Sequence, residues 1–258
     1  MICGRRVSKL QKIVENNNNV TYFPCDISNE KDVLEFVSDV SKDHDCVDVL
    51  INCAGLFGAI GRFDQTDSTE WKETIDINLF GTYLLAKHFL PLLLKSNIKK
   101  MINFSGGGAF GIFPNYSAYA VSKAAVVRLS ENMAKELEEL GVQVNCIAPG
   151  FVATEIHDAT LKIGKNKAGE EHYRLTKEKL QDGGVSMSVP VECVKFLISP
   201  DSDGLSGKTI SAGFDKWNTE GFKQAVKEIT ASELYSMRRV NLTSLDDQDG
   251  LKLKLEKL

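Results

Sequence analysis

The sequence is poor in the features that mark metal-binding, disulfide-linked and nucleic-acid-binding proteins. None of its six cysteines belongs to a C-x-x-C pair and its four histidines are isolated, so the spacing predicts neither a metal site nor a disulfide framework. The net charge is −4 and no basic stripe is present, which argues against a nucleic-acid partner. Scattered single cysteines fit a reduced, cytoplasmic chain.

Long apolar runs are also missing. The apolar stretch at 89–94 is interrupted by Pro91 and is far shorter than the ~20 residues that a membrane-spanning helix needs. No secretion signal is visible. We therefore expect no membrane partner.

The chain instead alternates short apolar runs with amphipathic segments. Apolar residues at helical spacing predict helices at 7–15, after Ser28, from about 67 to 94, from 117 to 140 and at 190–199. Apolar runs predict strands at 20–24, 47–52, 101–105, 142–148 and 208–212. This alternation is typical of a doubly wound α/β fold with a parallel sheet, whose ligands bind beyond the carboxyl ends of the strands.

Tyr119 and Lys123 stand four residues apart near the start of the helix predicted from 117, and so share one helix face. An ammonium at that distance favours the phenolate. We expect it to lower the pKa of Tyr119 and let the phenol exchange protons near neutral pH. The same pair is also common on ordinary helix surfaces.

Three further motifs accompany this pair. Asn52-Cys53-Ala54-Gly55 follows an apolar run, Asn78-Leu79-Phe80-Gly81 lies within the long helix, and Pro149-Gly150-Phe151-Val152-Ala153-Thr154 follows another apolar run. In this order and spacing they resemble the signatures of the short-chain dehydrogenase/reductase family over roughly residues 1–213. The resemblance implies a Rossmann-like fold and hydride transfer between a nicotinamide cofactor and a small-molecule carbonyl or secondary alcohol. The alternative is a non-catalytic binding or scaffold protein, or an inactive fragment of a longer enzyme.

The resemblance implies four catalytic residues. Tyr119 would be the general acid/base, Lys123 would hold the ribose of the nicotinamide, and Asn78 would position a water in a proton relay. The family usually places a serine thirteen residues before the tyrosine, where this chain has Gly106. Ser105 lies fourteen residues before Tyr119. If the loop between Gly111 and Tyr119 is one residue longer than usual in the family, we expect the Ser105 hydroxyl to stabilise the reacting oxygen. The alternative is that Gly106 fills the position and the serine function is lost.

The resemblance also implies a cofactor site. Asp26 would accept a hydrogen bond from the adenine, while Val152 and Thr154 would meet the nicotinamide carboxamide. The strand end Cys3-Gly4-Arg5-Arg6 lacks the acid that commonly binds a ribose 2′-hydroxyl, so Arg5 favours NADP(H), with NAD as the alternative. The full expected set is Arg5, Asp26, Ile27, Asn52, Ala54, Gly55, Tyr119, Lys123, Pro149, Gly150, Val152 and Thr154.

The glycine-rich turn of the family, T-G-x-x-x-G-x-G, does not occur before Asn52. Such a turn brings backbone N–H groups and a helix N-terminus to the cofactor pyrophosphate. We therefore expect an incomplete domain at 1–213 that lacks the first strand and its helix, carries unpaired strand edges and binds cofactor weakly. We interpret the missing turn as the result of a start site assigned too late, or of a fragment, rather than as a protein adapted to work without its first strand and glycine-rich turn.

Two segments remain. By resemblance, the polar residues of about 155–189, which show no clear period, form a substrate lid. Residues 214–258 form an extension in which Phe222, Val226, Ile229 and Leu234 predict an amphipathic helix. The resemblance also implies a homodimer or homotetramer joined through helices near 69–94 and 117–140.

Overall fold

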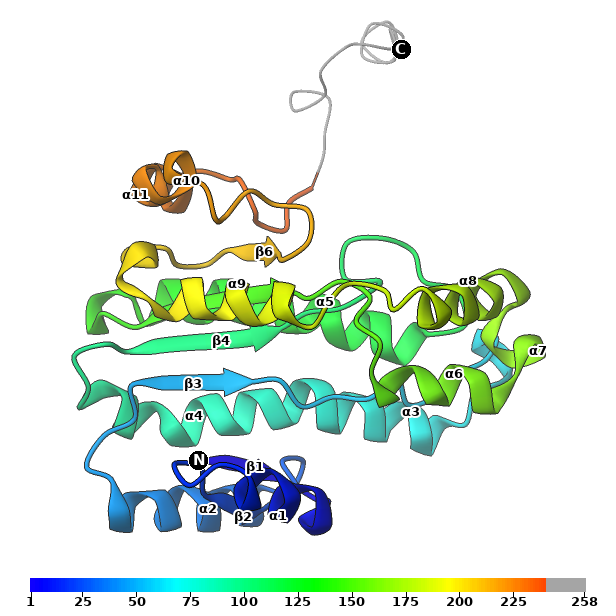
Figure 1. Ribbon diagram of the computed structural model, residues 1–258, viewed down its shortest axis with the longest axis horizontal. Helices are drawn as coiled ribbons and strands as arrows, with labels where there is room; N and C mark the ends of the chain where they lie inside the picture. Colours follow the sequence, from blue (N-terminus) through cyan, green and yellow to red (C-terminus); the bar gives the residue numbers. More distant parts are fainter. Residues whose placement is uncertain (240–258) are drawn as a thin grey trace, which may run out of the picture.

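The strands in the described part of the protein all pair in parallel, as the sequence predicts. The computed structural model describes residues 1–239, and Figure 1 shows their arrangement. The strands are β1 (Ile2–Gly4), β2 (Tyr22–Pro24), β3 (Val49–Asn52), β4 (Lys100–Phe104), β5 (Gln143–Ala148) and β6 (Thr209–Ser211). They form a two-stranded sheet, β1-β2, and a four-stranded sheet in the order β3-β4-β5-β6. The predicted parallel α/β fold is confirmed.

The helices follow the strands along the chain. They are α1 (Val7–Glu15), α2 (Glu30–Asp43), α3 (Ser68–Ile75), α4 (Gly81–Leu94), α5 (Ser117–Glu136) and α9 (Ser188–Ile198). A one-residue αL cap at Gly141, with φ of 71°, closes the short 3₁₀ turn that extends α5, where the sequence predicts the helix to end. The predicted helix from 67 to 94 is also present, and Asp67 caps it by accepting hydrogen bonds from the N–H groups of Thr69 and Glu70.

A π-helical turn, Asp76–Phe80, joins α3 to α4 and carries Asn78 inward. By length and composition alone the stretch Ser68–Leu94 could cross a membrane, but 56% of its most apolar window is buried inside the protein. Leu84, Phe89 and Leu93 of α4 belong to the core beneath β3 and β4. The stretch therefore packs as a core helix.

The two sheets are separate, because among residues 1–239 no backbone pairing joins β1 to β3. Each of these strands therefore has an unpaired edge, and Ile51 of β3 is 43% exposed. One hydrophobic core still bridges the two sheets. Phe36 of α2 packs against Phe23 of β2, with ring centroids 5.4 Å apart, and against Phe89 of α4, with ring centroids 5.1 Å apart.

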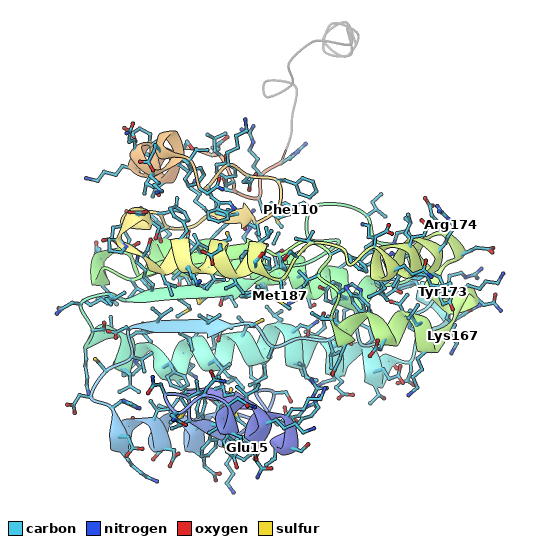
Figure 2. All side chains as sticks on the ribbon, viewed as in Figure 1. Glu15, Phe110, Lys167, Tyr173, Arg174 and Met187 are labelled. Carbon is cyan, nitrogen blue, oxygen red and sulfur yellow. The ribbon has the colours of Figure 1, made fainter. Side chains whose placement is uncertain are left out.

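The segment at 155–189, which the resemblance implies to be a substrate lid and which we call the lid, is largely helical although its sequence shows no clear period. It begins with a 3₁₀ turn at Glu155–His157 and continues as α6 (Asp158–Ile163), α7 (Lys165–Ala168) and α8 (Glu170–Gln181). Figure 1 shows these helices at the end of the molecule toward which β3 and β4 point. Figure 2 shows Lys167, Tyr173 and Arg174 gathered at this end, away from Glu15 of α1. The helices α6 and α7 are too short for a period to stand out in the sequence, and the 12 residues of α8 are mostly polar.

The described part of the C-terminal extension packs on its own domain. Its helices are α10 (Glu220–Gln224) and α11 (Val226–Ala231), and Phe222, Val226 and Ile229 are buried against Ile147 and Ile210 of the sheet. Leu234 is exposed and lies outside the helices, unlike the prediction. Residues 240–258 of the predicted extension lie outside the described residues.

Candidate active site

Tyr119 and Lys123 occupy the first turns of α5, which starts beside the carboxyl end of β4. Both side chains are buried, as is Asn78 in the π-helical turn. Lys123 Nζ donates a hydrogen bond to the carbonyl of Phe104, the last residue of β4, at 2.9 Å. A Cβ added to Gly55 would lie 3.1 Å from Asn78 Oδ1 and 3.2 Å from Lys123 Nζ. The fold thus gathers Asn78, Lys123 and Gly55 at one point.

Asn78 is held by both ends of its amide. Its Oδ1 accepts from the Leu56 N–H at 2.9 Å, and its Nδ2 donates to the Leu56 carbonyl at 2.9 Å and to Ser122 Oγ at 3.0 Å. Ser122 Oγ in turn donates to the Tyr119 carbonyl at 2.7 Å. Asn78 therefore fastens the loop after β3 to the first turn of α5. π-helical turns are frequent at functional sites.

The pKa of Tyr119 moves opposite to the sequence expectation. Burial raises the pKa of Tyr119 to about 12. Lys123 does not offset this, because its ammonium lies 5.8 Å from the phenol ring centroid and donates to the Phe104 carbonyl instead. Burial also lowers the pKa of Lys123. The expected lowering of the Tyr119 pKa is therefore wrong for this arrangement of the two side chains.

Gly106, rather than Ser105, faces the Tyr119 hydroxyl. A Cβ added to Gly106 would lie only 2.1 Å from Tyr119 Oη. Ser105 is buried, its N–H pairs with the Ile147 carbonyl at 2.9 Å, and its Oγ has no hydrogen-bond partner. The expected hydrogen bond between Ser105 and the phenol is therefore missing. The residue that faces the phenol is the one thirteen positions before Tyr119, which is Gly106. The prediction that a longer loop brings Ser105 to this place is wrong.

Aromatic side chains close the other side of Tyr119. Phe57 meets the Tyr119 ring edge-to-face at 4.7 Å, and Tyr116 packs on Phe57 at 5.2 Å. Tyr116 hydroxyl and Thr160 Oγ1 of α6 share a hydrogen bond of 2.8 Å, which ties α5 to the lid. The sequence analysis did not identify Phe57 and Tyr116. Their places next to the motifs could have indicated them, because Phe57 stands two residues after Gly55 and Tyr116 stands three residues before Tyr119.

The loop after β5 turns sharply at Gly150, whose φ of 79° favours glycine. Two contacts then hold the loop against the lid. The Val185 N–H donates to the Phe151 carbonyl at 2.7 Å, and His157 Nε2 lies 3.1 Å from the Val152 carbonyl. Thr154 immediately precedes the 3₁₀ turn of the lid.

Arg5 and Asp26 meet at the ends of β1 and β2. The guanidinium of Arg5 lies 3.6 Å from Asp26 and 4.0 Å from Glu73. Burial alone would raise the pKa of Asp26, but hydrogen bonds from Ser28 and the charge of Arg5 outweigh it, so the pKa of Asp26 is lowered. Arg6 pairs with Glu155 of the lid at 2.6 Å, and Lys9 pairs with the same carboxylate. A network of ion pairs, in which three carboxylates offset three cations, therefore borders this edge of the site.

Ile27 and Asn52 are placed by packing and by a buried amide pair. Ile27 lies under Gly81, where a Cβ would come within 2.7 Å of its side chain. Asn52 Nδ2 donates to Asn103 Oδ1 at 2.8 Å, and Asn103 Nδ2 donates to Ser130 Oγ at 2.8 Å. Asn52 Oδ1 has no partner. Within residues 1–239, no group of three or more His, Cys, Asp or Glu side chains could hold a metal ion.

Comparison with known proteins decides the family. A family model described as Enoyl-(Acyl carrier protein) reductase matches residues 3–214. Dehydrogenase/reductase SDR family member 4 of Bos taurus is 30% identical over 195 residues, which are 74% of this chain and 67% of the cattle protein. This chain belongs to the short-chain dehydrogenase/reductase family.

Other members of the family are similar over much of the chain. An uncharacterized oxidoreductase of Staphylococcus aureus is 30% identical over 187 residues, covering 69% of this chain and 80% of that protein. A crystal structure of a short chain dehydrogenase from Shigella flexneri, complexed with NADP, has a TM-score of 0.71 at 23% identity and covers 82% of this chain and 85% of that one. This second likeness shows the fold.

Family membership confirms the resemblance on which the site residues were chosen. In this short-chain dehydrogenase/reductase, residues of three of the four motifs come together from segments far apart in the sequence. Those around the expected reacting end are Asn78, Tyr119 and Lys123, with Gly106 facing the phenol. Those around the expected adenosine end are Arg5, Asp26 and Ile27, at the carboxyl ends of the two-stranded sheet.

Proposed function

We propose that this short-chain dehydrogenase/reductase transfers a hydride between NADP(H) and the carbonyl or secondary alcohol of a small molecule. The observation that carries the proposal is the burial of Tyr119 and Lys123 on adjacent turns of α5, with Asn78 fastened to the same turn. The bound nicotinamide would donate or accept the hydride. Tyr119 Oη would give a proton to the carbonyl oxygen, or take it from the alcohol.

The direction of the proposed reaction depends on the pKa of Tyr119. A phenol of pKa about 12 is almost fully protonated near neutral pH, which suits reduction of a carbonyl but not oxidation of an alcohol. Lys123 would release the Phe104 carbonyl and turn toward the ribose and the phenol, which lowers the Tyr119 pKa. Oxidation of an alcohol would need that lower pKa, whereas reduction of a carbonyl can use the protonated phenol as it stands, so we propose the reductive direction.

The other end of the site fits the cofactor less well. Arg5 suits a 2′-phosphate, which is why we propose NADP(H) before NAD. The Shigella flexneri protein is a complex with NADP, and a similar structure from Escherichia coli is a complex with NADPH; both agree with this choice. The sequence has no G-x-x-x-G-x-G turn before Asn52 to receive the pyrophosphate, so we expect weak binding.

The proposed setting is a cytoplasmic homodimer or homotetramer that binds neither nucleic acid nor membrane. Apolar side chains on the helices near 69–94 and 117–140 support the assembly. Phe80, Tyr83 and Val121 are exposed on these helices, and Phe80 stacks on Tyr83 at 5.8 Å.

A fluorescence titration with NADPH and NADH tests the cofactor proposal. We expect weak binding with preference for NADPH, and we expect Arg5→Ala to remove that preference. Arg62→Ala is the matched control, because Arg62 pairs with Asp64 on an exposed surface. If the folded chain binds neither nucleotide, the non-catalytic scaffold or inactive fragment becomes the better description. The displaced serine already favours that second candidate.

A further inference from the structure

His157 lies between the loop at 149–154 and α6, at the end of the lid's 3₁₀ turn. Only 7% of the residue is exposed. Its ring stacks on Phe151 at 3.8 Å and meets the edge of Phe57 at 5.6 Å. Since Phe57 also contacts Tyr119 at 4.7 Å, the imidazole belongs to an aromatic series that runs from the loop to the proposed acid/base.

The hydrogen bond of His157 fixes its tautomer. A carbonyl oxygen can only accept, so the nitrogen 3.1 Å from the Val152 carbonyl, Nε2, must carry the proton. Nδ1 is then an acceptor, and it is buried without a partner. Protonating Nδ1 would bury an unpaired N–H and place a cation near His172 and Lys179 of α8, with Asp158 as the opposing charge. Burial accordingly lowers the pKa of His157.

The carbonyl that His157 binds belongs to the loop expected to meet the nicotinamide carboxamide. A trans peptide is planar, so holding the Val152 carbonyl also fixes the direction of the Ala153 N–H. On its other side the loop is held by the Val185 N–H and by a bridge between Val152 and Gly184. His157 supplies the side-chain half of this clamp.

We infer that His157 is a positioning residue that orders the loop at 149–154 for the nicotinamide end of the cofactor. This role rests on the proposed function. The imidazole does not contact the reacting atoms. It acts through the Val152 carbonyl, and its stacking on Phe151 and Phe57 sets the direction in which Nε2–H points.

Two substitutions separate the hydrogen bond from the packing. His157→Phe keeps an aromatic ring between Phe151 and Phe57 but removes the donor, whereas His157→Gln restores an N–H donor near the position of Nε2. We expect His157→Phe to speed amide hydrogen exchange in peptides that cover 150–157 and Val185, without changing exchange in β4 or β5. His157→Gln should retain protection close to that of the unsubstituted chain.

NADPH binding gives a second readout. Loss of one neutral hydrogen bond, worth about 0.5–1.5 kcal/mol, corresponds to roughly twofold to tenfold weaker binding. We expect that loss in His157→Phe and recovery in His157→Gln. Equal exchange of the loop in His157→Phe and the unsubstituted chain would overturn the inference. If the unsubstituted chain binds no NADPH, the proposed function fails, while the exchange measurement still decides whether His157 orders the loop.

Discussion

At the scale of single residues, the candidate site depends on burial as much as on spacing. The sequence places Tyr119 and Lys123 on one helix face, and the structure keeps them there. Burial nevertheless raises the pKa of the phenol and lowers the pKa of the ammonium, because desolvation disfavours the charged form of each group. The spacing of Tyr119 and Lys123 thus predicts an activated tyrosine, whereas the structure has a protonated phenol and a lysine that donates its hydrogen bond to the Phe104 carbonyl.

Tyr119→Phe should abolish turnover while leaving cofactor affinity nearly unchanged. The substitution removes only the hydroxyl, so the edge contact with Phe57 remains. General acid catalysis typically contributes about 10²–10⁴-fold to a rate. Steady-state kinetics with a carbonyl substrate and a parallel NADPH titration would check both halves. Retained turnover would remove Tyr119 from the acid/base role.

The serine position is tested by a pair of substitutions. Ser105→Ala should leave the rate unchanged, because Ser105 Oγ has no partner and Gly106 faces the phenol. Gly106→Ser should lower kcat, because a Cβ there would lie 2.1 Å from Tyr119 Oη and would displace the hydroxyl of the proposed acid/base. Comparing kcat of both variants with that of the unsubstituted chain shows whether residue 105 or residue 106 faces the reacting oxygen. A large loss in Ser105→Ala would return the role to Ser105.

At the scale of elements, the π-helical turn and the lid shape the site. The turn lets one long helix present Asn78 to the loop after β3, which a regular helix predicted from apolar spacing does not reveal. Two of the three α-helices of the lid, α6 and α7, are short, and contacts with distant residues hold the lid, such as that between Thr160 and Tyr116. Helices in proteins gain most of their stability from such packing, so a short helix need not show a period in its sequence.

Lid histidines should make the fold sensitive to mild acid. Burial lowers the pKa of both His157 and His172 below the value of ~6.5 expected in the unfolded chain. The unfolded state then binds more protons between the folded and unfolded pKa values, so stability rises with pH through that window. We expect the free energy of unfolding to fall as pH drops below about 6.5.

Urea denaturation at pH 7.5 and 5.5 would measure this loss. His172→Phe should show a smaller loss than the unsubstituted chain, because it removes one of the two titrating groups. His44→Phe is the control, since His44 lies at the exposed end of α2. An equal loss in all three proteins would exclude the lid histidines as its source.

At the scale of the whole molecule, the separation of the two sheets is the dominant feature. The core of α2 and α4 joins them, while the edges of β1 and β3 are unpaired among the described residues. An unpaired strand edge can pair with a strand of another chain, especially where an apolar side chain is exposed. On β3 this exposed apolar side chain is Ile51.

We expect the chain to self-associate with rising concentration, and Ile51→Lys to reduce this association. A charge on an edge strand disfavours pairing with a second chain. Leu34→Lys is the matched control, because Leu34 is 48% exposed but lies on the surface of α2. Light scattering over a concentration series measures the difference. The same reduction by both substitutions would show that general hydrophobicity, rather than the strand edge, causes the association.

The sequence alone determined the order of strands and helices, the parallel α/β class, the family and the grouping of Asn78 with Tyr119 and Lys123. These follow from local periodicity and from motifs at fixed spacing. The absent glycine-rich turn also predicted the unpaired strand edges. Only the tertiary structure decided that Gly106 faces the phenol, that burial raises the Tyr119 pKa and that the lid is helical. These depend on which distant residues pack against a segment or exclude water from a side chain, and local spacing does not encode that.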